Sequence, residues 1–253
     1  MTYDYIVKAS YGNDSVALIQ WAHEQGLQNV ATLYNDTRWA EDEWNDRVFA
    51  LEAWVMTLGF TPLRTQSMGL EALARQKKAW PRQGLQFCTQ HLKIEPTTKL
   101  LQRIDPERKS TSVIGVRRAE SRNRANFPEW SEQDGRKCWA PLVDYTDEMR
   151  DVLLRRTGLE PLPHRSDECF PCINSNRADL RRLSETAIDK IEAIETSMGH
   201  TAKGSPRTMF RPYRYQGATG IREIVRWARS ERGEFNLDDG EGGAGCEAGW
   251  CGL

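Results

Sequence analysis

The stretch YIVKASYGNDS, residues 5–15, decides the fold of this chain. Its beginning, Tyr5 to Ala9, predicts a short buried strand, and a helix is predicted from Ser15 to Glu24. A strand that turns directly into a helix directs free backbone N–H groups and the positive end of the helix dipole toward one point. The stretch therefore predicts an anion-binding turn near the N-terminus.

The alternation of strands and helices continues along the first half of the chain. Further strands are predicted at 30–34, 61–65 and 112–116, with helices at 41–58, 69–78 and 94–103. Strands separated by helices of ten or more residues indicate βαβ units. The predicted fold is α/β, with a mostly parallel, doubly wound, Rossmann-like sheet whose ligands bind beyond the carboxyl ends of the strands.

The second half of the chain has a different character. Helices are predicted at 147–156 and at 177–198, and the segment between them is rich in Pro and Cys. We expect three regions: a nucleotide-binding α/β domain over 1–160, a cysteine-containing helical and basic segment over 161–235, and a flexible Gly/Asp-rich tail with two cysteines over 236–253.

Composition excludes some classes of protein. The 253 residues carry 35 Lys and Arg against 36 Asp and Glu, a formal net charge of −1, which argues against a uniformly basic nucleic-acid binder. No run approaches the roughly 18 to 20 apolar residues of a membrane span, and the N-terminus lacks the pattern of a signal peptide. We therefore expect a cytoplasmic protein without membrane partners, in which the six cysteines serve as core residues, metal ligands or nucleophiles.

The predicted turn contains the residue types that suit a phosphate. Gly12 permits an unusual backbone angle and a close approach of the ligand. Ser10 and Ser15 supply hydroxyl donors, and Asp14 caps the helix or holds the turn closed. The alternative is an ordinary N-capped turn between a strand and a helix. A Walker A sequence is absent.

Four ordered motifs resemble one family. The turn resembles the S-x-G-x-D-S signature of the PP-loop superfamily, of the adenine nucleotide alpha hydrolase-like type, and more narrowly the phosphoadenosine phosphosulfate (PAPS) reductase family; Asn13 replaces the more usual Lys. LYNDT (33–37), GVRRAESR (115–122) and PLVDYT (141–146) resemble three further stretches of that family, in the same order. The resemblance covers roughly residues 5–175. It implies nucleotide-binding roles for Ser10, Gly12, Asp14, Ser15, Asp36, Thr37, Arg117 and Arg118.

A local excess of positive charge accompanies these motifs. Residues 99–124 hold eight Lys and Arg against three acids, and Arg117 and Arg118 directly follow a predicted strand. The planar guanidinium group of arginine suits phosphate or sulfate oxygens. The alternative for such a cluster is a solvated loop.

The cysteines indicate a metal or redox site. Cys169 and Cys172 form a C-x-x-C pair, which serves in zinc half-sites, redox dithiols and iron–sulfur sites. CTQHLKIEP, residues 88–96, resembles a run of the iron–sulfur members of the same family, although Phe87 breaks their tandem cysteine pair. The resemblance implies that Cys88, Cys169 and Cys172 are ligands of a [4Fe–4S] cluster. Zinc is the alternative, and His91 beside this run is the one histidine that we would test.

The fourth ligand and the nucleophile remain to be assigned. Cys138, Cys246 and Cys251 are the candidates for the fourth ligand, and Cys138 suits a structural thiol on a strand. The last residues, WCGL, resemble the family's C-terminal E-C-G-[IL], whose cysteine takes sulfur from the substrate. That match implies Cys251 as nucleophile and leaves Cys246 as a metal ligand; the reverse assignment stays open. Lys93 is expected to lower the pKa of the attacking thiol.

Three functions follow as hypotheses. The first is an adenylyl-sulfate (PAPS or APS) reductase that forms an S-sulfo-cysteine and then sulfite, with thioredoxin or glutaredoxin as the external thiol reductant. The second is an ATP-dependent PP-loop sulfurtransferase acting on nucleic acid, for which the basic residues of 201–235 with their interleaved aromatics would form the binding face. The third is a zinc-stabilised nucleotide-sensing protein without catalysis.

Overall fold

A six-stranded sheet forms the centre of the protein, in a computed structural model that describes residues 2–211 and 217–230. The strand order is β3-β2-β1-β4-β6-β5, and every neighbouring pair is parallel except the β5–β6 hairpin. The strands are β1 (Tyr5–Lys8), β2 (Val30–Asp36), β3 (Thr61–Gln66), β4 (Thr111–Val113), β5 (Trp130–Gln133) and β6 (Arg136–Trp139). The predicted mostly parallel sheet is confirmed.

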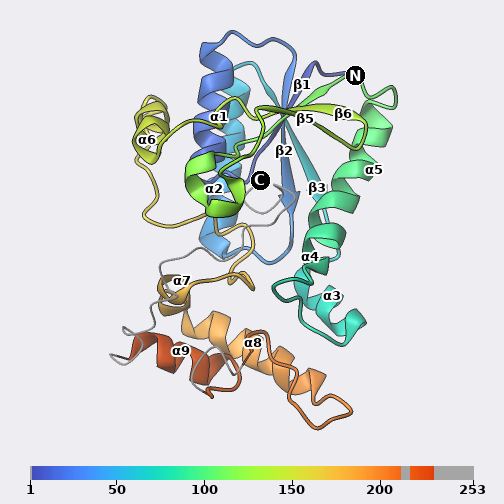
Figure 1. The fold of residues 1–253 in the computed structure, drawn as a ribbon, viewed down its shortest axis with the longest axis vertical. Helices are drawn as coiled ribbons and strands as arrows, with labels where there is room; N and C mark the ends of the chain where they lie inside the picture. Colours follow the sequence, from blue (N-terminus) through green and yellow to red (C-terminus); the bar gives the residue numbers. More distant parts are fainter. Residues whose placement is uncertain (1, 212–216, 231–253) are drawn as a thin grey trace.

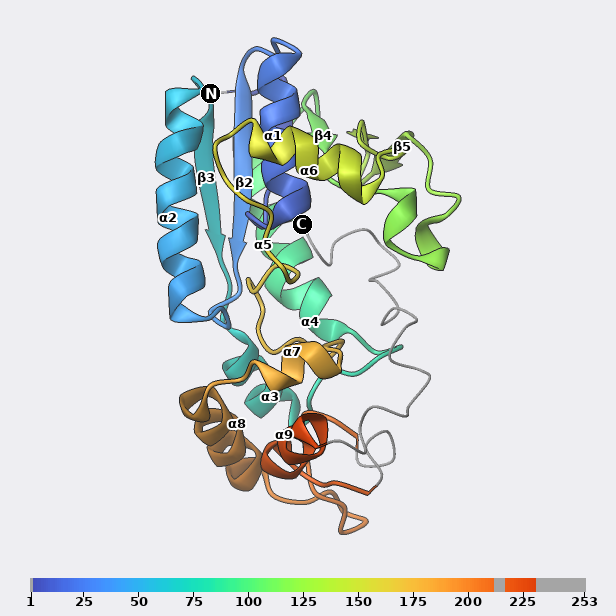
Figure 2. The same cartoon turned by 90° about the vertical axis from the view of Figure 1, so that its left-hand side faces the viewer.

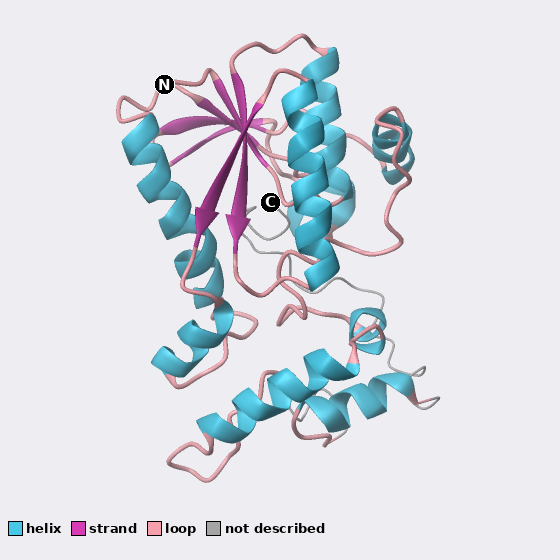
Figure 3. Cartoon of the chain, turned by 180° about the vertical axis from the view of Figure 1, so that it is seen from behind, coloured by secondary structure: helices cyan, strands magenta, loops and turns pink. Residues whose placement is uncertain are grey.

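Helices cover both faces of this sheet, which confirms the doubly wound arrangement. Helices α1 (Asn13–Glu24) and α2 (Asp42–Thr57) lie on one face, α5 (Glu95–Ile104) lies on the other, and α6 (Asp147–Arg155) packs outside α1 (Figures 1 and 3). The burial of α2 follows its sequence, because its apolar positions recur at helical spacing and face the sheet. The buried residues of α2 are Trp44, Val48, Leu51 and Val55.

The predicted helix over 177–198 is wrong as a single element. The chain forms α7 (Arg177–Arg181) and then α8 (Glu185–Met198), separated by a short break. The hydroxyl of Ser184 accepts a hydrogen bond from the backbone N–H of Ala187, which makes Ser184 the N-cap of a new helix. Charge and periodicity alone did not reveal this cap.

The C-terminal helices share a hydrophobic core with part of the first region. Helices α8 and α9 (Ile221–Arg229) pack with α3 (Leu70–Lys77) and with Trp39, which follows β2. Figure 2 shows α3 beside α7, α8 and α9 below the sheet. Helices from both sides of residue 160 therefore contribute to one hydrophobic core. No described helix has the length and apolar character needed to cross a membrane.

One of the cysteines, Cys138, belongs to the β5–β6 hairpin at the edge of the sheet. Cys138 lies on β6, is 1 % exposed and packs with Ile114 and Val116. This agrees with a structural thiol. Strand β5 was missing from the sequence-based prediction, because Trp-Ser-Glu-Gln at an exposed edge carries no buried apolar alternation.

Glu195 of α8 connects three segments of the C-terminal part. Its buried carboxylate accepts hydrogen bonds from the backbone N–H groups of Met209 (2.8 Å) and Ile221 (2.9 Å). We expect Glu195→Ala to lower the free energy of unfolding by about 2–3 kcal/mol, because two buried donors lose their acceptor. Urea unfolding measures this change. Thr196→Ala, at an exposed position of the same helix, is the control, and equal destabilisation by both variants would contradict the assignment.

Lys8 on β1 gives the stability of the protein a pH dependence. Burial lowers the pKa of its ammonium group from 10.5 to about 7. Between these two values the unfolded chain binds more protons at this site than the folded chain, so the free energy of unfolding rises with pH across that window. Lys8→Met removes the burial cost and should stabilise the protein most near pH 7 and progressively less toward pH 10. Lys137→Met, on the exposed side of β6, serves as the control; a gain from Lys8→Met that does not vary with pH would contradict the account.

Candidate functional site

The predicted phosphate turn lies between β1 and α1 at the carboxyl edge of the sheet. Ser15 donates a hydrogen bond from its hydroxyl to the Gly12 carbonyl (3.1 Å), and Ser10 accepts a weak one from the Gly12 N–H (3.4 Å). The φ angle of Gly12 is −78°, so the expected unusual backbone angle is absent there. Close approach explains this glycine instead, because an added Cβ would lie 2.9 Å from Ser166 Cβ.

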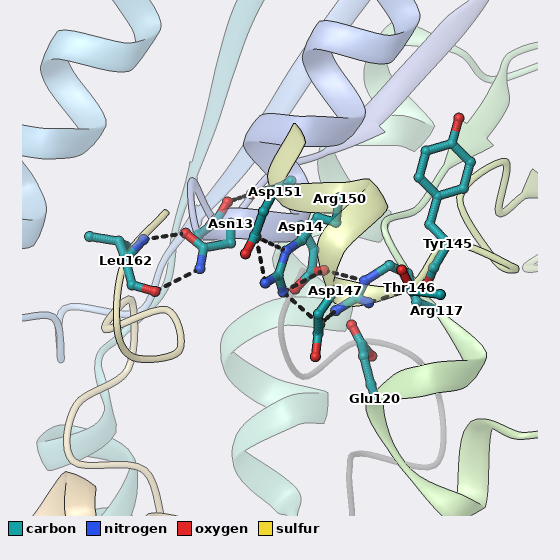
Figure 4. A network of polar contacts seen from close by, with 12 residues as sticks. Asn13, Asp14, Arg117, Glu120, Tyr145, Thr146, Asp147, Arg150, Asp151 and Leu162 are labelled. Carbon is teal, nitrogen blue, oxygen red and sulfur yellow. Dashed lines mark hydrogen bonds and ion pairs between the residues drawn. The ribbon is translucent and has the colours of Figure 1, made fainter. Parts of the chain in front are cut away.

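Asn13 holds a distant segment over the turn. Its side-chain amide donates to the Leu162 carbonyl and its side-chain oxygen accepts from the Leu162 N–H, both at 2.9 Å (Figure 4). Both polar atoms of the Asn13 side chain, which replaces the family's usual Lys, are thus hydrogen-bonded to the backbone. Asn13 fixes the position of the segment that leads to the C-x-x-C pair.

Arg117 is buried beneath the turn and organises its carboxylate. The guanidinium group donates to Asp14 Oδ1 (2.6 Å), to Asp147 Oδ1 (2.8 Å) and to the Tyr145 carbonyl (3.3 Å). The side chain is 2 % exposed. In this structure the Arg117 guanidinium supports Asp14 and also lines the cavity, and its direct contact with a phosphate stays a prediction (Figure 4).

Arg150 of α6 is a cavity residue that the sequence analysis missed. Its guanidinium lies 3.5 Å from Asp14 Oδ1 and 3.2 Å from Asp147 Oδ1. The one available signal was its position shortly after the PLVDYT motif. Arg118, in contrast, pairs with Asp144 and donates to the Phe127 carbonyl (2.9 Å), and it does not line the cavity.

A cavity of about 640 Å³ joins the phosphate turn to the cysteines. This volume suits a nucleotide-sized ligand. Of the predicted nucleotide-binding residues, Ser15, Asp36 and Arg118 do not line it. The predicted residues on its wall are Ser10, Gly12, Asp14, Thr37, Cys88, Lys93, Arg117, Cys169 and Cys172.

The end of β2 holds the C-x-x-C segment in place. The Thr37 hydroxyl donates to the Glu168 carbonyl (2.6 Å), and the Phe170 N–H donates to the Trp39 carbonyl (2.8 Å). The indole N–H of Trp39 donates to the Pro171 carbonyl (3.1 Å). Three hydrogen bonds thus attach the cysteines to the carboxyl edge of the sheet.

Burial raises the pKa values of the three cavity thiols. Burial, with a smaller contribution from Cys172, raises the pKa of the Cys88 thiol to about 11, and Lys93 opposes this rise. Burial also raises the pKa values of Cys169 and Cys172. Because a bound metal deprotonates its thiols outright, such a site gains thiolates when a cation binds.

Lys93 forms a buried ion pair inside the cavity. It lies on the π-helical turn Gln90–Ile94, which follows α4 (Phe87–Thr89), and its ammonium group contacts Glu168 Oε1. Glu168 is 2 % exposed and directly precedes Cys169. Glu168 could not be identified from the sequence, because nothing there separates it from the carboxylates that lie on the surface.

The thiols of Cys88, Cys169 and Cys172 are of the kind that binds zinc or an iron–sulfur cluster, and all three line the cavity. Within the described residues, no group of three or more His, Cys, Asp and Glu side chains is placed to hold one metal ion. The predictions for Cys246 and Cys251 lie outside the described residues. His91 pairs with Glu95 (3.1 Å) and does not line the cavity.

The second basic segment, residues 201–235, uses several of its arginines internally. Arg222 pairs with Glu192 (2.8 Å), Arg229 pairs with Glu185 (3.0 Å), and Arg207 donates to the Met198 carbonyl (3.0 Å) at the end of α8. These contacts are structural. They reduce the charge that this segment presents to solvent.

Comparison with known families agrees with the geometry of the turn and the sheet. The model of the "Phosphoadenosine phosphosulfate reductase domain" matches residues 4–167, more than half of the chain. The chain therefore belongs to the phosphoadenosine phosphosulfate reductase domain family. The matched part ends before the C-x-x-C pair and the helices α7, α8 and α9.

Individual relatives are distant. The chain is 24 % identical over 161 residues to the phosphoadenosine 5′-phosphosulfate reductase of Vibrio atlanticus (strain LGP32), covering 64 % of this chain and 61 % of the relative. It is 27 % identical over 167 residues to the protein of that name from Thiocapsa roseopersicina, covering 64 % and 66 %. The chain thus spans less than two thirds of the length of these relatives.

Two solved structures are similar at 12 % identity. One is the PAPS reductase of Candida auris in a phosphate complex, with a TM-score of 0.48 over 62 % of this chain and 74 % of that one. The other is the NMN synthetase of Francisella tularensis, with a TM-score of 0.47 over 93 % and 88 %.

Substitutions of the adjacent Arg117 and Arg118 test the supporting role of Arg117. Arg117→Lys should lower the free energy of unfolding by about 2 kcal/mol or more, because lysine cannot bridge two carboxylates and a carbonyl from a buried position. Arg118→Lys, at a half-exposed ion pair, should cost less than about 1 kcal/mol. Thermal and urea unfolding of both variants measure the difference. Equal effects would contradict the supporting role of Arg117.

Proposed function

We propose that this protein is an adenylyl-sulfate reductase-like enzyme of the sulfur-group oxidoreductase class. The single observation that carries the proposal is the shared cavity, in which the phosphate turn and three thiols face the same space. A nucleotide bound by its phosphate at the turn would extend toward the cysteines. Family membership over residues 4–167 supports the same conclusion.

The proposed binding mode follows from the polar groups of the cavity. The backbone N–H groups at the start of α1 and the Ser10 hydroxyl would hold the phosphate, with Arg150 supplying positive charge. Arg117 keeps Asp14 fixed at the turn. The rest of the nucleotide would occupy the carboxyl edge of the sheet, where ligands of such folds bind.

The proposed reaction is attack by a cysteine on sulfur. The Cys251 thiolate would form an S–S bond with the sulfate sulfur while the S–O bond to the nucleotide phosphate breaks, releasing the adenosine phosphate. Two external thiols, as in thioredoxin or glutaredoxin, would then release sulfite and become a disulfide. Lys93 would supply positive charge beside the developing anion.

The cysteines of the cavity would hold a cofactor in this proposal. Cys88, Cys169, Cys172 and Cys246 would provide the four thiolates of a [4Fe–4S] cluster, and zinc is the alternative. A bound cluster would supply a redox-active metal–thiolate group next to the nucleotide. Iron, sulfide and zinc analysis of anaerobically purified protein distinguishes the two cofactors.

The surroundings of Asp14 favour the reductase over the ATP-dependent sulfurtransferase. Enzymes that use ATP bind it with Mg²⁺, commonly through carboxylates. Asp14, the one carboxylate of the turn, already contacts Arg117 (2.6 Å) and Arg150 (3.5 Å). Pyrophosphate release from ATP together with salt-dependent nucleic-acid binding would instead support the sulfurtransferase.

Cys251→Ser tests the proposed reaction. The variant should lower sulfite release from adenylyl sulfate by at least about 1,000-fold, because the attacking sulfur is lost. The assay measures sulfite with a dithiol reductant present.

Cys246→Ser is the matched control for this test. It should lower the iron or zinc content of the purified protein, whereas Cys251→Ser should leave that content unchanged. Sulfite release by the Cys251→Ser variant at the wild-type rate would contradict the assignment of the nucleophile.

A further inference from the structure

The Glu168 carboxylate is buried, and only one of its two oxygens has a partner within the part of the chain that the structure describes. Oε1 contacts the ammonium of Lys93, while Oε2 has no hydrogen-bond partner among the described residues. Native structures rarely leave such an oxygen without a donor, so it indicates a group that binds there. Because the last torsion of a glutamate side chain is broad, the carboxylate can turn into the cavity that Glu168 lines without backbone movement.

Glu168 lies where such folds place the acid that binds ribose. In dinucleotide-binding folds of this kind, with a phosphate at the turn after the first strand, an acidic residue after the second strand hydrogen-bonds the ribose 2′-hydroxyl, which is adjacent to the 3′-hydroxyl. Asp36 is the acid at the end of β2, but its Oδ1 accepts from the Arg38 N–H (2.8 Å) and the residue does not line the cavity. Thr37, the next residue, holds Glu168 at this position instead.

We propose that Glu168 accepts hydrogen bonds from the ribose hydroxyls of the bound nucleotide and selects nucleotides with a free 3′-hydroxyl over those with a 3′-phosphate. This inference rests on the proposed function and specifies its substrate class as an adenylyl nucleotide without a 3′-phosphate.

Electrostatics supports the same selection. A 3′-phosphate lacks the donor that Glu168 needs and adds about two negative charges beside a carboxylate, which repels them. The basic groups along this wall have acidic partners: Lys93 contacts Glu168 itself, Arg182 binds Asp167 (2.9 Å), and Arg165 lies 3.6 Å from Asp179. The wall therefore favours hydroxyl groups over a second phosphate.

Calorimetric titration of the full chain with three stable nucleotides tests the proposal without any substitution. AMP should bind at least about 10-fold more tightly than 3′-deoxyadenosine 5′-monophosphate, because a hydrogen bond to a charged group is lost. Adenosine 3′,5′-bisphosphate should also bind at least about 10-fold more weakly than AMP, because the carboxylate repels its second phosphate.

The Glu168→Gln variant tests whether this side chain causes the preference for AMP over adenosine 3′,5′-bisphosphate. The variant keeps the shape and an acceptor oxygen but removes the negative charge, so the preference for AMP over the bisphosphate should fall by about 10-fold. Glu132→Gln, the same substitution at an exposed position on β5, should keep the wild-type preference.

The outcomes separate the inference from the proposed function. Equal or tighter binding of the bisphosphate by the wild-type protein overturns the inference and leaves the proposed function standing, as does an undiminished preference in the Glu168→Gln variant. Binding of none of the three nucleotides overturns the proposed function and the inference with it.

Discussion

The hydrogen bond from the Thr37 hydroxyl to the Glu168 carbonyl is the contact on which the site depends. It joins the end of β2 to the C-x-x-C segment, two parts of the chain 131 residues apart. The Thr37 side chain is buried at the carboxyl edge of the sheet, so the contact has a fixed position. Together with the two hydrogen bonds of Trp39, it places Cys169 and Cys172 on the wall of the cavity that the phosphate turn also lines.

Polar residues of the turn are used mainly to assemble the walls of that cavity. Asn13 binds the backbone of Leu162, and Asp14 binds Arg117 and Arg150. Such contacts give a preorganised site, because the groups that surround the ligand are already oriented before it arrives. In the proposed binding mode, the backbone of the turn and the Ser10 hydroxyl would hold the phosphate.

Local sequence patterns predicted the sheet and the position of the turn, because strand and helix periodicity is a property of neighbouring residues. The resemblance to a known family also predicted that Cys88, Cys169 and Cys172 lie at one site, and all three line the cavity. The Arg117–Asp147 ion pair, Arg150 and the Lys93–Glu168 ion pair could not be predicted in this way. Each depends on the distance between side chains that are far apart in the sequence, which only the packed fold determines.

The break between α7 and α8 and the ion pairs of Arg222 also could not be predicted from local sequence patterns. A serine N-cap within a charged segment differs little from any other serine until its hydroxyl meets a backbone N–H. The positive charge of Arg222 counted toward the hypothetical nucleic-acid face of residues 201–235, yet Arg222 pairs with three acids of α8. Charge counted along the sequence gives no information about such pairing.

Protection of thiols by a nucleotide tests the central claim most directly. If the phosphate turn and the cysteines share one cavity, saturating AMP should slow the alkylation of Cys88, Cys169 and Cys172 in reduced, metal-free protein, as followed by mass spectrometry of the individual peptides. We predict a slowing of about 10-fold or more at these thiols, since an occupied cavity blocks access to its wall. Unchanged alkylation of all three thiols while AMP is bound would contradict the claim.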